Sequence, residues 1–302
     1  MRVGVTGSTG FVGSALVTAL ERRGDDVVRF VRPSTDAVTG KSVRWDPERS
    51  LLDEDDLRAV GGFDAVINLA GSPIASHRWT ESYRRGVMTS RTSATKLLVE
   101  ALTSLTSGVA VLVSGSAVGY YGSRGDETLD ETSTSGGDYV AEVCRAWEGA
   151  ATPFRDTGAS LALVRTGIVL GRGGGVLDRL LPLFRAGLGG VIGSGHQWMS
   201  PISLFDEVAA LVWLVDHQLA GTFNLCSPQP CTNRALTGAL ARALHRPAIM
   251  HVPSAALKLA LGSEMARNTV LSSQRVVPRA LVASGFVFNA PDISQVIASA
   301  LG

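Results

Sequence analysis

The sequence predicts an α/β fold in which a doubly wound parallel sheet is followed by a smaller, mostly helical lobe. Short apolar runs alternate with stretches of helical spacing through the first half of the chain, which is typical of a parallel sheet covered by helices. After residue 165 the sequence changes to glycine-rich loops and short segments punctuated by prolines. We therefore expect a sheet lobe at 1–165 and a second lobe, with a helical C-terminal segment, at 166–302.

The elements of the first lobe can be read in order from apolar runs and their spacing. Runs that are strongly apolar or rich in β-branched residues predict strands at Arg2–Thr6, Asp26–Val31, Val43–Trp45, Ala65–Leu69, Val109–Ser114 and Ser160–Arg165. Apolar residues at helical spacing predict helices at Phe11–Arg23, Glu81–Leu105 and Tyr139–Asp156. The alternation contains no flexible linker and no internal repeat.

Composition excludes several classes of protein. Apolar residues make up 45% of the chain and charged residues 18%, as in an ordinary folded enzyme. The net charge of +1 gives no general attraction for nucleic acid or for an anionic membrane, so neither is an expected partner. Arg, Asp or Gly interrupts every apolar stretch before it reaches membrane-spanning length, and no cleavable signal is recognisable. We expect a cytoplasmic protein, and an oligomer is compatible with the sequence.

The three cysteines give no sign of a metal centre. Their number is odd, and their positions (Cys144, Cys226 and Cys231) match no zinc-binding spacing. We expect buried or half-buried thiols in a reducing compartment and no metal ligand.

A glycine triplet follows the first expected strand and opens the first expected helix. Gly7, Gly10 and Gly13 have the spacing that lets a chain turn sharply, approach a pyrophosphate and pack a helix against a strand. Plain turns also use such glycines, but the strand–loop–helix context favours a Rossmann-like dinucleotide site. The helix would then point the amides of its first turn, near Phe11 and Val12, at the phosphates.

The end of the second expected strand indicates which dinucleotide is bound. An NAD site places an acidic residue there to hold the ribose 2′-hydroxyl, whereas this strand is followed by Arg32. A guanidinium suits a 2′-phosphate, because it is planar and permanently charged. The alternative is a solvated Arg32 with Asp36 reaching back to the ribose. The sequence favours NADP.

An ordered set of further motifs makes the whole chain resemble a known family. The motifs are Thr6-Gly7-x-x-Gly10-x-x-Gly13, Asn68-Leu69-Ala70-Gly71, Arg78-Trp79, Ser90-Arg91, Gly115–Gly122, Trp147-Glu148, Arg165–Gly171 and Gly193–Trp198. In this order they resemble the atypical extended short-chain dehydrogenase/reductases, the epimerase-family or nucleoside-diphosphate-sugar epimerase-like proteins. The tail resembles the small C-terminal segment of that family, whose role is unassigned.

The resemblance implies further cofactor-binding positions. Leu69, Ala70 and Gly71 would lie at the end of the fourth strand, where the backbone meets the adenosine side, and their small size is compatible with that contact. Arg91 would face the cofactor from the long helix, and Val169 would lie near the nicotinamide in the loop after the sixth strand. The alternatives are core packing for Leu69 and Ala70, and a surface salt bridge with Glu81 or a neighbouring residue for Arg91.

The resemblance also supplies candidate catalytic residues, and here the sequence departs from the pattern. Active short-chain dehydrogenases use a serine, a tyrosine and a lysine four residues after the tyrosine. Ser116 and Tyr139 match the first two, but Val143 stands where the lysine is expected. An unperturbed tyrosine has a pKa of about 10, so little tyrosinate forms at neutral pH without a nearby cation. Packing of Tyr139 in a helix face is the alternative.

Two function classes therefore remain open. The first is an NADP-dependent oxidoreductase or epimerase acting on a small-molecule substrate, either a nucleotide-linked sugar or a small carbonyl compound. Arginines expected at the mouth of the site (Arg165, Arg172 and Arg185) would suit a phosphate-bearing substrate. The second is a cofactor-binding sensor or partner protein with little or no catalysis. The missing lysine separates the two classes.

Overall fold

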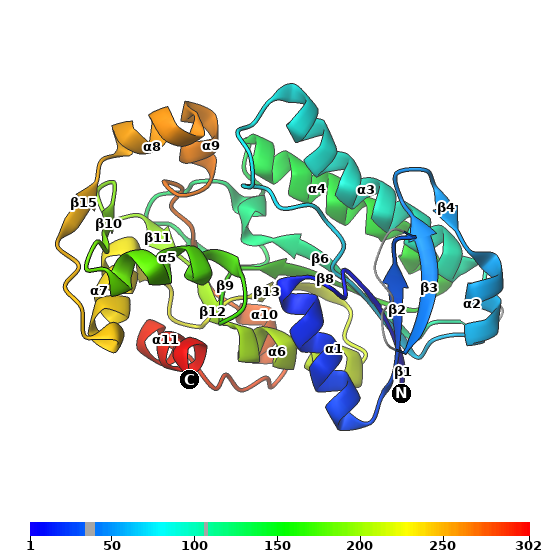
Figure 1. The fold of residues 1–302 in the computed structure, drawn as a ribbon. Coiled ribbons are helices and arrows are strands. Elements are labelled where there is room, and N and C mark those ends of the chain that lie inside the picture. Colours follow the sequence, from blue (N-terminus) through cyan, green and yellow to red (C-terminus); the bar gives the residue numbers. More distant parts are fainter. Residues whose placement is uncertain (34–39, 106–107) are drawn as a thin grey trace.

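An eight-stranded sheet forms the centre of the computed structural model, which describes residues 1–33, 40–105 and 108–302 (Figure 1). Its strands are β1 (Arg2–Thr6), β2 (Asp26–Val31), β3 (Lys41–Asp46), β4 (Leu51–Leu52), β5 (Ala65–Asn68), β6 (Val111–Ala117), β8 (Ser160–Thr166) and β13 (Gly221–Leu225). They lie in the order β13-β8-β6-β5-β1-β2-β3-β4, and every neighbouring pair is parallel except β3 and β4. The predicted doubly wound parallel sheet is confirmed.

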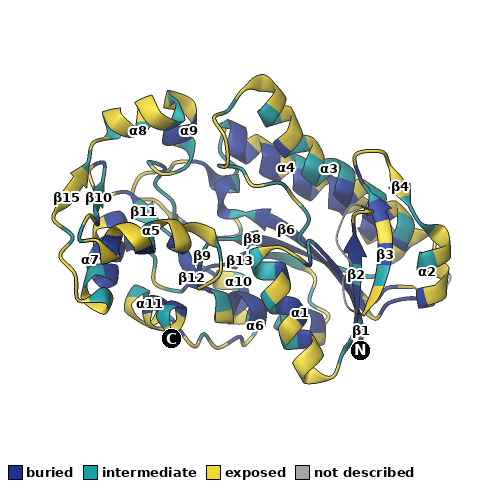
Figure 2. Cartoon of the chain, viewed as in Figure 1, coloured by how far each residue is buried: buried dark blue, intermediate teal, exposed yellow. Residues whose placement is uncertain are grey.

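Helices cover both faces of this sheet. One face is packed by α1 (Phe11–Arg23), α6 (Leu204–Asp216) and α10 (Arg279–Ala283), and the other by α2 (Glu54–Val60), α3 (Glu81–Thr103), α4 (Tyr139–Ala151) and the 3₁₀ turn η2 (Thr152–Thr157). Figure 2 shows the strands as a buried layer between helices whose outer sides are exposed. Strands buried on both faces explain the continuous apolar runs in the sequence.

Four of the helices that pack on the sheet (α2, α3, α4 and α6) begin at a polar side chain that caps them, whereas α1 and α10 do not. Asp53, Thr80 and Asp138 each accept a backbone hydrogen bond from the first turn of the helix that follows. Helix α1 begins instead at Gly10, which has no side chain to cap it. The amides at the start of α1 are therefore left open to a ligand.

The chain after residue 165 supplies both the edge of the sheet and a second lobe. Strand β13 and helix α6 come from this part of the chain, yet they pack with the strands and helices of the first half. The remaining elements are β9 (Ile168–Leu170), α5 (Gly175–Arg185), β10 (Gly190–Ile192), β11 (Trp198–Met199), β12 (Pro201–Ser203), β14 (Cys231–Thr232), α7 (Asn233–Leu244), β15 (Met250–Val252), α8 (Ser254–Leu261), α9 (Ser263–Asn268), β16 (Arg275–Val276) and α11 (Ile293–Leu301). Helices α5, α7 and α11 share a separate apolar core.

Some boundaries differ from those that the sequence predicts. The strand expected at Val109–Ser114 is β6, which begins at Val111 and continues to Ala117, so that Ser116 lies within it. Helix α4 ends at Ala151 and continues as η2 rather than as regular helix. Short elements η1 (Val118–Tyr121) and β7 (Thr128–Leu129) follow β6. Within the described residues, no helix is long and apolar enough to cross a membrane.

Candidate functional site

The glycine loop brings β1, β5 and α1 closer together than side chains would allow. Gly7 has φ +63°, and a Cβ atom added there would lie 2.7 Å from the Leu69 carbonyl oxygen. A Cβ atom at Gly13 would lie 2.1 Å from the Gly7 carbonyl oxygen, whereas at Gly10 it would meet only that oxygen, at 3.2 Å. Gly7 and Gly13 thus fix the fold of the loop, and Gly10 faces open space.

Two polar features at this loop lack protein partners. The first turn of α1 contains no acidic residue, and its N-cap at Gly10 makes no side-chain hydrogen bond. The Ser8 hydroxyl is buried and has no hydrogen-bond partner among the described residues. Buried polar groups normally pair, so an orphaned hydroxyl beside an uncapped helix N-terminus fits an anionic ligand such as a pyrophosphate.

A pocket of about 350 Å³ lies over the glycine loop at the carboxyl edge of the sheet. Its lining comes from the ends of β1, β2, β3 and β5 and from α3: Gly7, Ser8, Thr9, Gly10, Phe30, Val31, Arg32, Trp45, Pro47, Leu69, Ala70, Gly71, Ser72, Pro73, Ser90 and Ala94. The structure thus brings together the glycine loop, Arg32 and the turn after β5 that the sequence analysis singled out.

Arg32 reaches this pocket from the end of β2. Its side chain is 52% exposed, and Nη2 lies 3.5 Å from Glu48 Oε1. An exposed ion pair of this length contributes little, so the guanidinium can turn to a phosphate at small cost. The alternative ribose partner, Asp36, lies outside the described residues.

A buried hydrogen-bond network holds the end of β5 in place. Asn68 accepts a hydrogen bond from the Thr6 hydroxyl at 2.7 Å and donates one to the Thr95 hydroxyl at 2.9 Å. The Thr6 hydroxyl oxygen in turn accepts the backbone amides of Leu69 (3.0 Å) and Ala70 (3.1 Å). This network ties β1, β5 and α3 together and fixes the backbone that lines the pocket.

Arg91 lies beside this turn on α3 as a half-buried cation. Its Nη1 donates to the carbonyl oxygens of Ser72 at 2.9 Å and Val87 at 3.1 Å, and its guanidinium lies over the Trp147 ring at 5.0 Å. A Cβ atom at Gly71 would lie 3.2 Å from it, which accounts for the glycine. Burial lowers the pKa of Arg91 below its usual range.

The predicted salt-bridge alternative for Arg91 is wrong. Glu81 pairs instead with Arg85, one helical turn on, at 3.3 Å. Among the described residues, no carboxylate lies within ion-pair distance of Arg91. A half-buried cation bonded only to carbonyl oxygens retains the capacity to hold an anionic or hydroxyl-bearing ligand.

Phe11 and Val169 lie on either side of one glycine-rich loop. Val169 occupies the short strand β9, paired with Ile202 of β12, and not a loop as the resemblance implied. A Cβ atom at Gly175 would lie 3.1 Å from the Phe11 ring and 3.3 Å from the Val169 carbonyl oxygen. Phe11 therefore packs on this loop with its side chain, while Val12 packs against the core beneath α1. Only their backbone amides remain for a phosphate.

Ser116 belongs to a buried polar cluster that the sequence analysis did not predict as a site. Its hydroxyl donates to Glu148 Oε1 at 2.7 Å, and Arg165 binds both Glu148 oxygens, at 2.8 and 2.9 Å. Arg165 also donates to the Tyr121 hydroxyl at 3.0 Å, and Tyr121 donates to Asn224 at 2.7 Å. Burial raises the pKa of Tyr121 to about 12, against the opposing charge of Arg165.

This cluster corrects the expected role of Arg165. The side chain is 5% exposed and fully engaged, so Arg165 does not flank a substrate mouth as predicted. The sequence did contain the residues of this cluster, in the motifs Trp147-Glu148 and Arg165–Gly171. That they form an ion pair could not be predicted, because it depends on the strand register that places Ser116 opposite Arg165. Arg172 lines a hollow between α1 and α6 instead, and its guanidinium donates to the Leu301 carbonyl oxygen.

Tyr139 does not share a partner with Ser116. Its hydroxyl donates to the Arg84 carbonyl oxygen at 2.6 Å, and its ring contacts Trp79 with centroids 5.0 Å apart. The Arg84 guanidinium stacks over the ring at 4.1 Å, so a cation reaches this tyrosine from α3 rather than from α4. Burial raises the pKa of Tyr139, and the charges of Arg84 and Arg91 oppose that rise.

The face of α4 that packs against η1, just beyond Ser116, is formed by residues other than Tyr139. A Cβ atom at Gly119 would lie 2.4 Å from Val140 Cγ1 and 3.8 Å from Cys144 Sγ. Tyr139 and Val143 pack instead with Val87 of α3. The structure thus places neither a tyrosine nor a lysine of α4 against η1. Packing, the alternative reading of Tyr139, accounts for its described contacts.

Comparison with known proteins adds the family. Residues 3–226 match the sequence profile of the NAD dependent epimerase/dehydratase family, and residues 252–300 match a domain of unknown function, DUF1731. Epimerase family protein ML0860 of Mycobacterium leprae is 40% identical over 299 residues, which cover 99% of this chain and 95% of that protein.

Two solved structures have related sequences as well as the same fold. Human epimerase family protein SDR39U1 (isoform 2), crystallised with NADPH, has a TM-score of 0.88 and 32% identity over 99% of both chains. The nucleoside-diphosphate sugar epimerase from Corynebacterium glutamicum has a TM-score of 0.79 and 35% identity, covering 100% of this chain and 58% of that chain.

Proposed function

Because the chain belongs to the NAD dependent epimerase/dehydratase family, we propose that it binds NADP(H) at the carboxyl edge of the sheet and catalyses an oxidoreductase or epimerase reaction on a carbonyl or nucleotide-linked sugar substrate. The observation that carries this proposal is the open start of α1, where the uncapped first turn and the unpartnered Ser8 hydroxyl face the glycine loop. A pyrophosphate satisfies both.

NADP(H) is the cofactor that the sequence favours, and the human relative crystallised with NADPH supports it. Arg32 would hold the 2′-phosphate, since it lines the pocket and its exposed pairing with Glu48 is weak. Leu69, Ala70 and Gly71 would contact the adenosine side through the backbone that Thr6 fixes. Arg91 would supply a cation to the ribose or phosphates from beneath Gly71.

When bound, the cofactor supplies or accepts a hydride. We propose that Ser116 orients the substrate oxygen and that Tyr139 acts as the proton donor, with Arg84 and Arg91 in place of the missing lysine. The Ser116 hydroxyl donates its one proton to Glu148 in this structure, so it would have to turn that proton to the substrate oxygen, while Arg165 continues to neutralise Glu148. The name of the Corynebacterium glutamicum relative makes nucleoside diphosphate sugars the first substrate class to test.

A second candidate function is cofactor binding with little or no turnover, as in a sensor or a partner protein. The observation that favours it is the Tyr139 hydroxyl, which is already committed to the Arg84 carbonyl oxygen. A proton donor of this kind would have to exchange that partner for the substrate oxygen during each turnover.

A spectrophotometric screen separates the two functions. NADPH and NADP⁺ would each be mixed with the protein and a panel of nucleoside diphosphate sugars and small carbonyl compounds, and the absorbance of the reduced nicotinamide followed. The sugar products would also be separated by chromatography, because an epimerase returns its cofactor to the starting oxidation state and gives no net change in absorbance. The proposed enzyme gives turnover that Tyr139→Phe removes while cofactor affinity stays the same. Full activity of Tyr139→Phe on a confirmed substrate would exclude the tyrosine, and cofactor binding without any turnover would favour the second function.

A further inference from the structure

The loop between β5 and α3 covers Tyr139, the proton donor in the proposed function. Within residues 72–80 of this loop, which we call the strap, Ile74 and Trp79 pack on Tyr139, and the Trp79 and Tyr139 ring centroids lie 5.0 Å apart. Tyr139 is only 7% exposed. A substrate that reacts with the Tyr139 hydroxyl must therefore first displace part of this cover.

The strap also reaches the cofactor pocket. Ser72 and Pro73, at its first end, line that pocket. The Ser72 carbonyl oxygen accepts a hydrogen bond from Arg91 Nη1 at 2.9 Å, and the Ser72 amide donates to the Ser90 hydroxyl at 3.1 Å. These bonds fix the first end of the strap to α3. The strap thus connects the cofactor pocket with the tyrosine, and its far end is the part that can open.

The strap is folded on itself between its two ends. Trp79 Nε1 donates to the Ile74 carbonyl oxygen at 2.9 Å, which closes residues 74–79 into a compact turn. The Tyr83 hydroxyl, in the first turn of α3, accepts the Ser76 amide at 3.2 Å. A segment closed in this way can move as one piece, and Trp79 would move with it.

The C-terminal segment holds the outer side of the strap through Arg78. Arg78 Nε donates to the Ala260 carbonyl oxygen at 2.9 Å, and Nη2 donates to that of Leu259. Both carbonyl groups belong to the last turn of α8, where they lack partners within the helix. Figure 1 shows α8 and α9 beside the loop that leads into α3. The eight residues of α8 are all exposed or half-buried, so few apolar contacts resist its displacement.

A second contact joins the C-terminal segment to the residue that holds the Tyr139 hydroxyl. Arg84 Nη1 lies 3.3 Å from Glu264 Oε2 of α9, and the Arg84 guanidinium stacks over the Tyr139 ring at 4.1 Å. The Tyr139 hydroxyl donates to the Arg84 carbonyl oxygen. The Arg84–Glu264 pair is partly exposed and therefore weak, as a contact that opens and closes reversibly has to be.

We propose that the C-terminal segment latches the strap: α8 holds Arg78 and α9 holds Arg84, so that Tyr139 stays covered until the strap is released to admit a substrate. Loops that close over a site exclude water during the reaction and open for exchange of substrate and product. The latch gives the region that matches DUF1731 a part in access to the site. The inference rests on the proposed role of Tyr139, but its test needs no substrate. A confirmed latch without turnover would refute the proposed chemistry alone.

Acetylation of the tyrosines by N-acetylimidazole tests the latch on the full chain. The chain has four tyrosines, so mass spectrometry of its peptides can follow each of them. Arg78→Ala should speed acetylation of Tyr139 at least about fivefold, because the strap loses its hydrogen bonds to α8. Tyr121 is fully buried and should stay unreactive, which shows that the fold is intact.

Two further variants probe the cover and the second contact. Trp79→Ala removes the cover itself and should speed acetylation of Tyr139 more than Arg78→Ala does. Glu264→Gln breaks the exposed pair with Arg84 and should give a smaller acceleration. No acceleration in Trp79→Ala would show that the strap does not protect Tyr139, and would overturn the proposal.

Arg85→Ala is the matched control, since Arg85 is an exposed arginine of α3 whose side chain pairs with Glu81 on the same helix. The rate of Tyr139 acetylation should be the same in this variant and in the unmutated protein. Equal acceleration by Arg85→Ala and Arg78→Ala would indicate general loosening of α3 and would overturn the latch. Unchanged rates in both Arg78→Ala and Glu264→Gln would also overturn it.

Discussion

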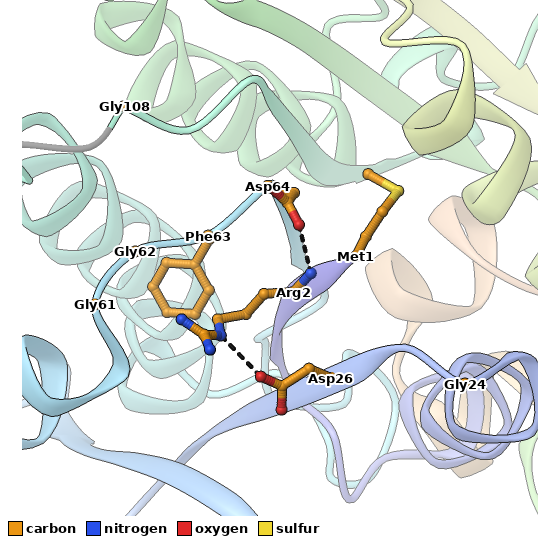
Figure 3. Close-up of a pocket in the computed structure, with 9 residues that line it drawn as sticks. All are labelled: Met1, Arg2, Gly24, Asp26, Gly61, Gly62, Phe63, Asp64 and Gly108. Carbon is orange, nitrogen blue, oxygen red and sulfur yellow. Dashed lines mark hydrogen bonds and ion pairs between the residues drawn. The ribbon is translucent and has the colours of Figure 1, made fainter.

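A hollow lies at each end of the parallel strands: one at their N-terminal ends, the amino edge of the sheet, and one at their C-terminal ends, the carboxyl edge. The two hollows differ in how their polar groups are paired. At the amino edge a hollow of about 460 Å³ is crossed by Arg2, which donates to Asp26 at 2.8 Å and, through its backbone amide, to Asp64 at 2.6 Å (Figure 3). The Arg2 guanidinium also donates to the Val60 carbonyl oxygen, at the end of α2. These polar groups are already satisfied by the protein.

At the carboxyl edge the pocket is smaller, and some of the polar groups around it form no hydrogen bond with the described residues. The helices run antiparallel to the strands, so their C-terminal carbonyl groups lie at the amino edge and their N-terminal amides at the carboxyl edge. At the carboxyl edge, within residues 1–33, 40–105 and 108–302, no side chain caps the start of α1 and the Ser8 hydroxyl has no partner. Unsatisfied polar groups, and not the size of the hollow, therefore distinguish a ligand site from a surface depression.

The largest expected effect is the loss of cofactor binding in Gly10→Val. A branched side chain at Gly10 would occupy the space of the pyrophosphate, and only the Gly7 carbonyl oxygen lies near its Cβ, so the fold should survive. NADPH affinity should fall more than about a hundredfold, which calorimetry measures. The matched amino-edge change, Gly24→Ala, should cost about 1 kcal/mol of stability because φ is +88° there, with unchanged affinity. Unchanged NADPH affinity in a folded Gly10→Val protein would remove the basis of the comparison.

The two edges should also respond oppositely to pH. Burial raises the pKa of Glu207 to about 8, and its one described partner is the Thr166 hydroxyl at the carboxyl end of β8. The folded state therefore holds the proton more tightly than the unfolded state, and the free energy of unfolding falls as the pH rises from about 4.5 to about 8. The loss attributable to Glu207 is on the order of 4 kcal/mol.

Denaturant unfolding across this pH range checks the Glu207 prediction. Glu207→Gln should remove most of the decline, while Glu264→Gln, at an exposed site, should leave it in place. At the amino edge, Lys41 and Arg2 lower the pKa of Asp26, so its contribution is lost in acid instead. An identical pH profile for Glu207→Gln and the unmutated protein would contradict the assignment of a buried, protonated carboxyl group.

Arg32→Ala should give a smaller loss that is specific to one cofactor. Loss of the charged group that donates to the 2′-phosphate should weaken the binding of NADPH by about 1–3 kcal/mol and leave the binding of NADH nearly unchanged. Arg2→Ala removes an arginine of the amino edge and should change neither affinity. Equal weakening of NADPH and NADH by Arg32→Ala would indicate a general effect on the pocket and not contact with the 2′-phosphate.

The smallest expected effect is the stability change in Tyr139→Phe. The Tyr139 hydroxyl donates to the half-buried carbonyl oxygen of Arg84, so removal of the hydroxyl should lower the free energy of unfolding by about 1 kcal/mol. Val143→Lys should destabilise more, because Val143 is 2% exposed among apolar neighbours. If Val143→Lys were more stable than the unmutated protein, residue 143 would have to lie next to an acidic group or to solvent, and not among apolar side chains.

The sequence was sufficient to predict the features that depend on local spacing. Gly7 needs a φ of +63° within the turn itself, Gly13 packs against the nearby Gly7 carbonyl oxygen, and Arg32 follows directly from the end of β2. The helix boundaries of α1 and the alternation of strands and helices are of the same local kind. These predictions succeeded because their physical causes lie in the chain segment itself.

The features that the sequence did not predict depend on contacts between distant segments. Whether Tyr139 or Val140 faces η1 depends on the rotation of α4 about its own axis. The spacing of apolar residues defines that rotation only to within one residue, so it cannot decide between the two. The pairing of Arg165 with Glu148 depends on the β6–β8 register. The addition of β13 to the sheet similarly depends on a segment beyond the predicted boundary at residue 165.

Calorimetric titration of the unmutated protein with NADPH and with NADH tests the central claim most directly, because it needs neither a substrate nor a variant. The pocket at the carboxyl edge predicts one saturable site for NADPH, with NADH at least about tenfold weaker because it lacks the phosphate that Arg32 would hold. Equal affinities for the two would contradict the role of Arg32. The absence of binding to either would contradict the assignment of the carboxyl edge as the cofactor site.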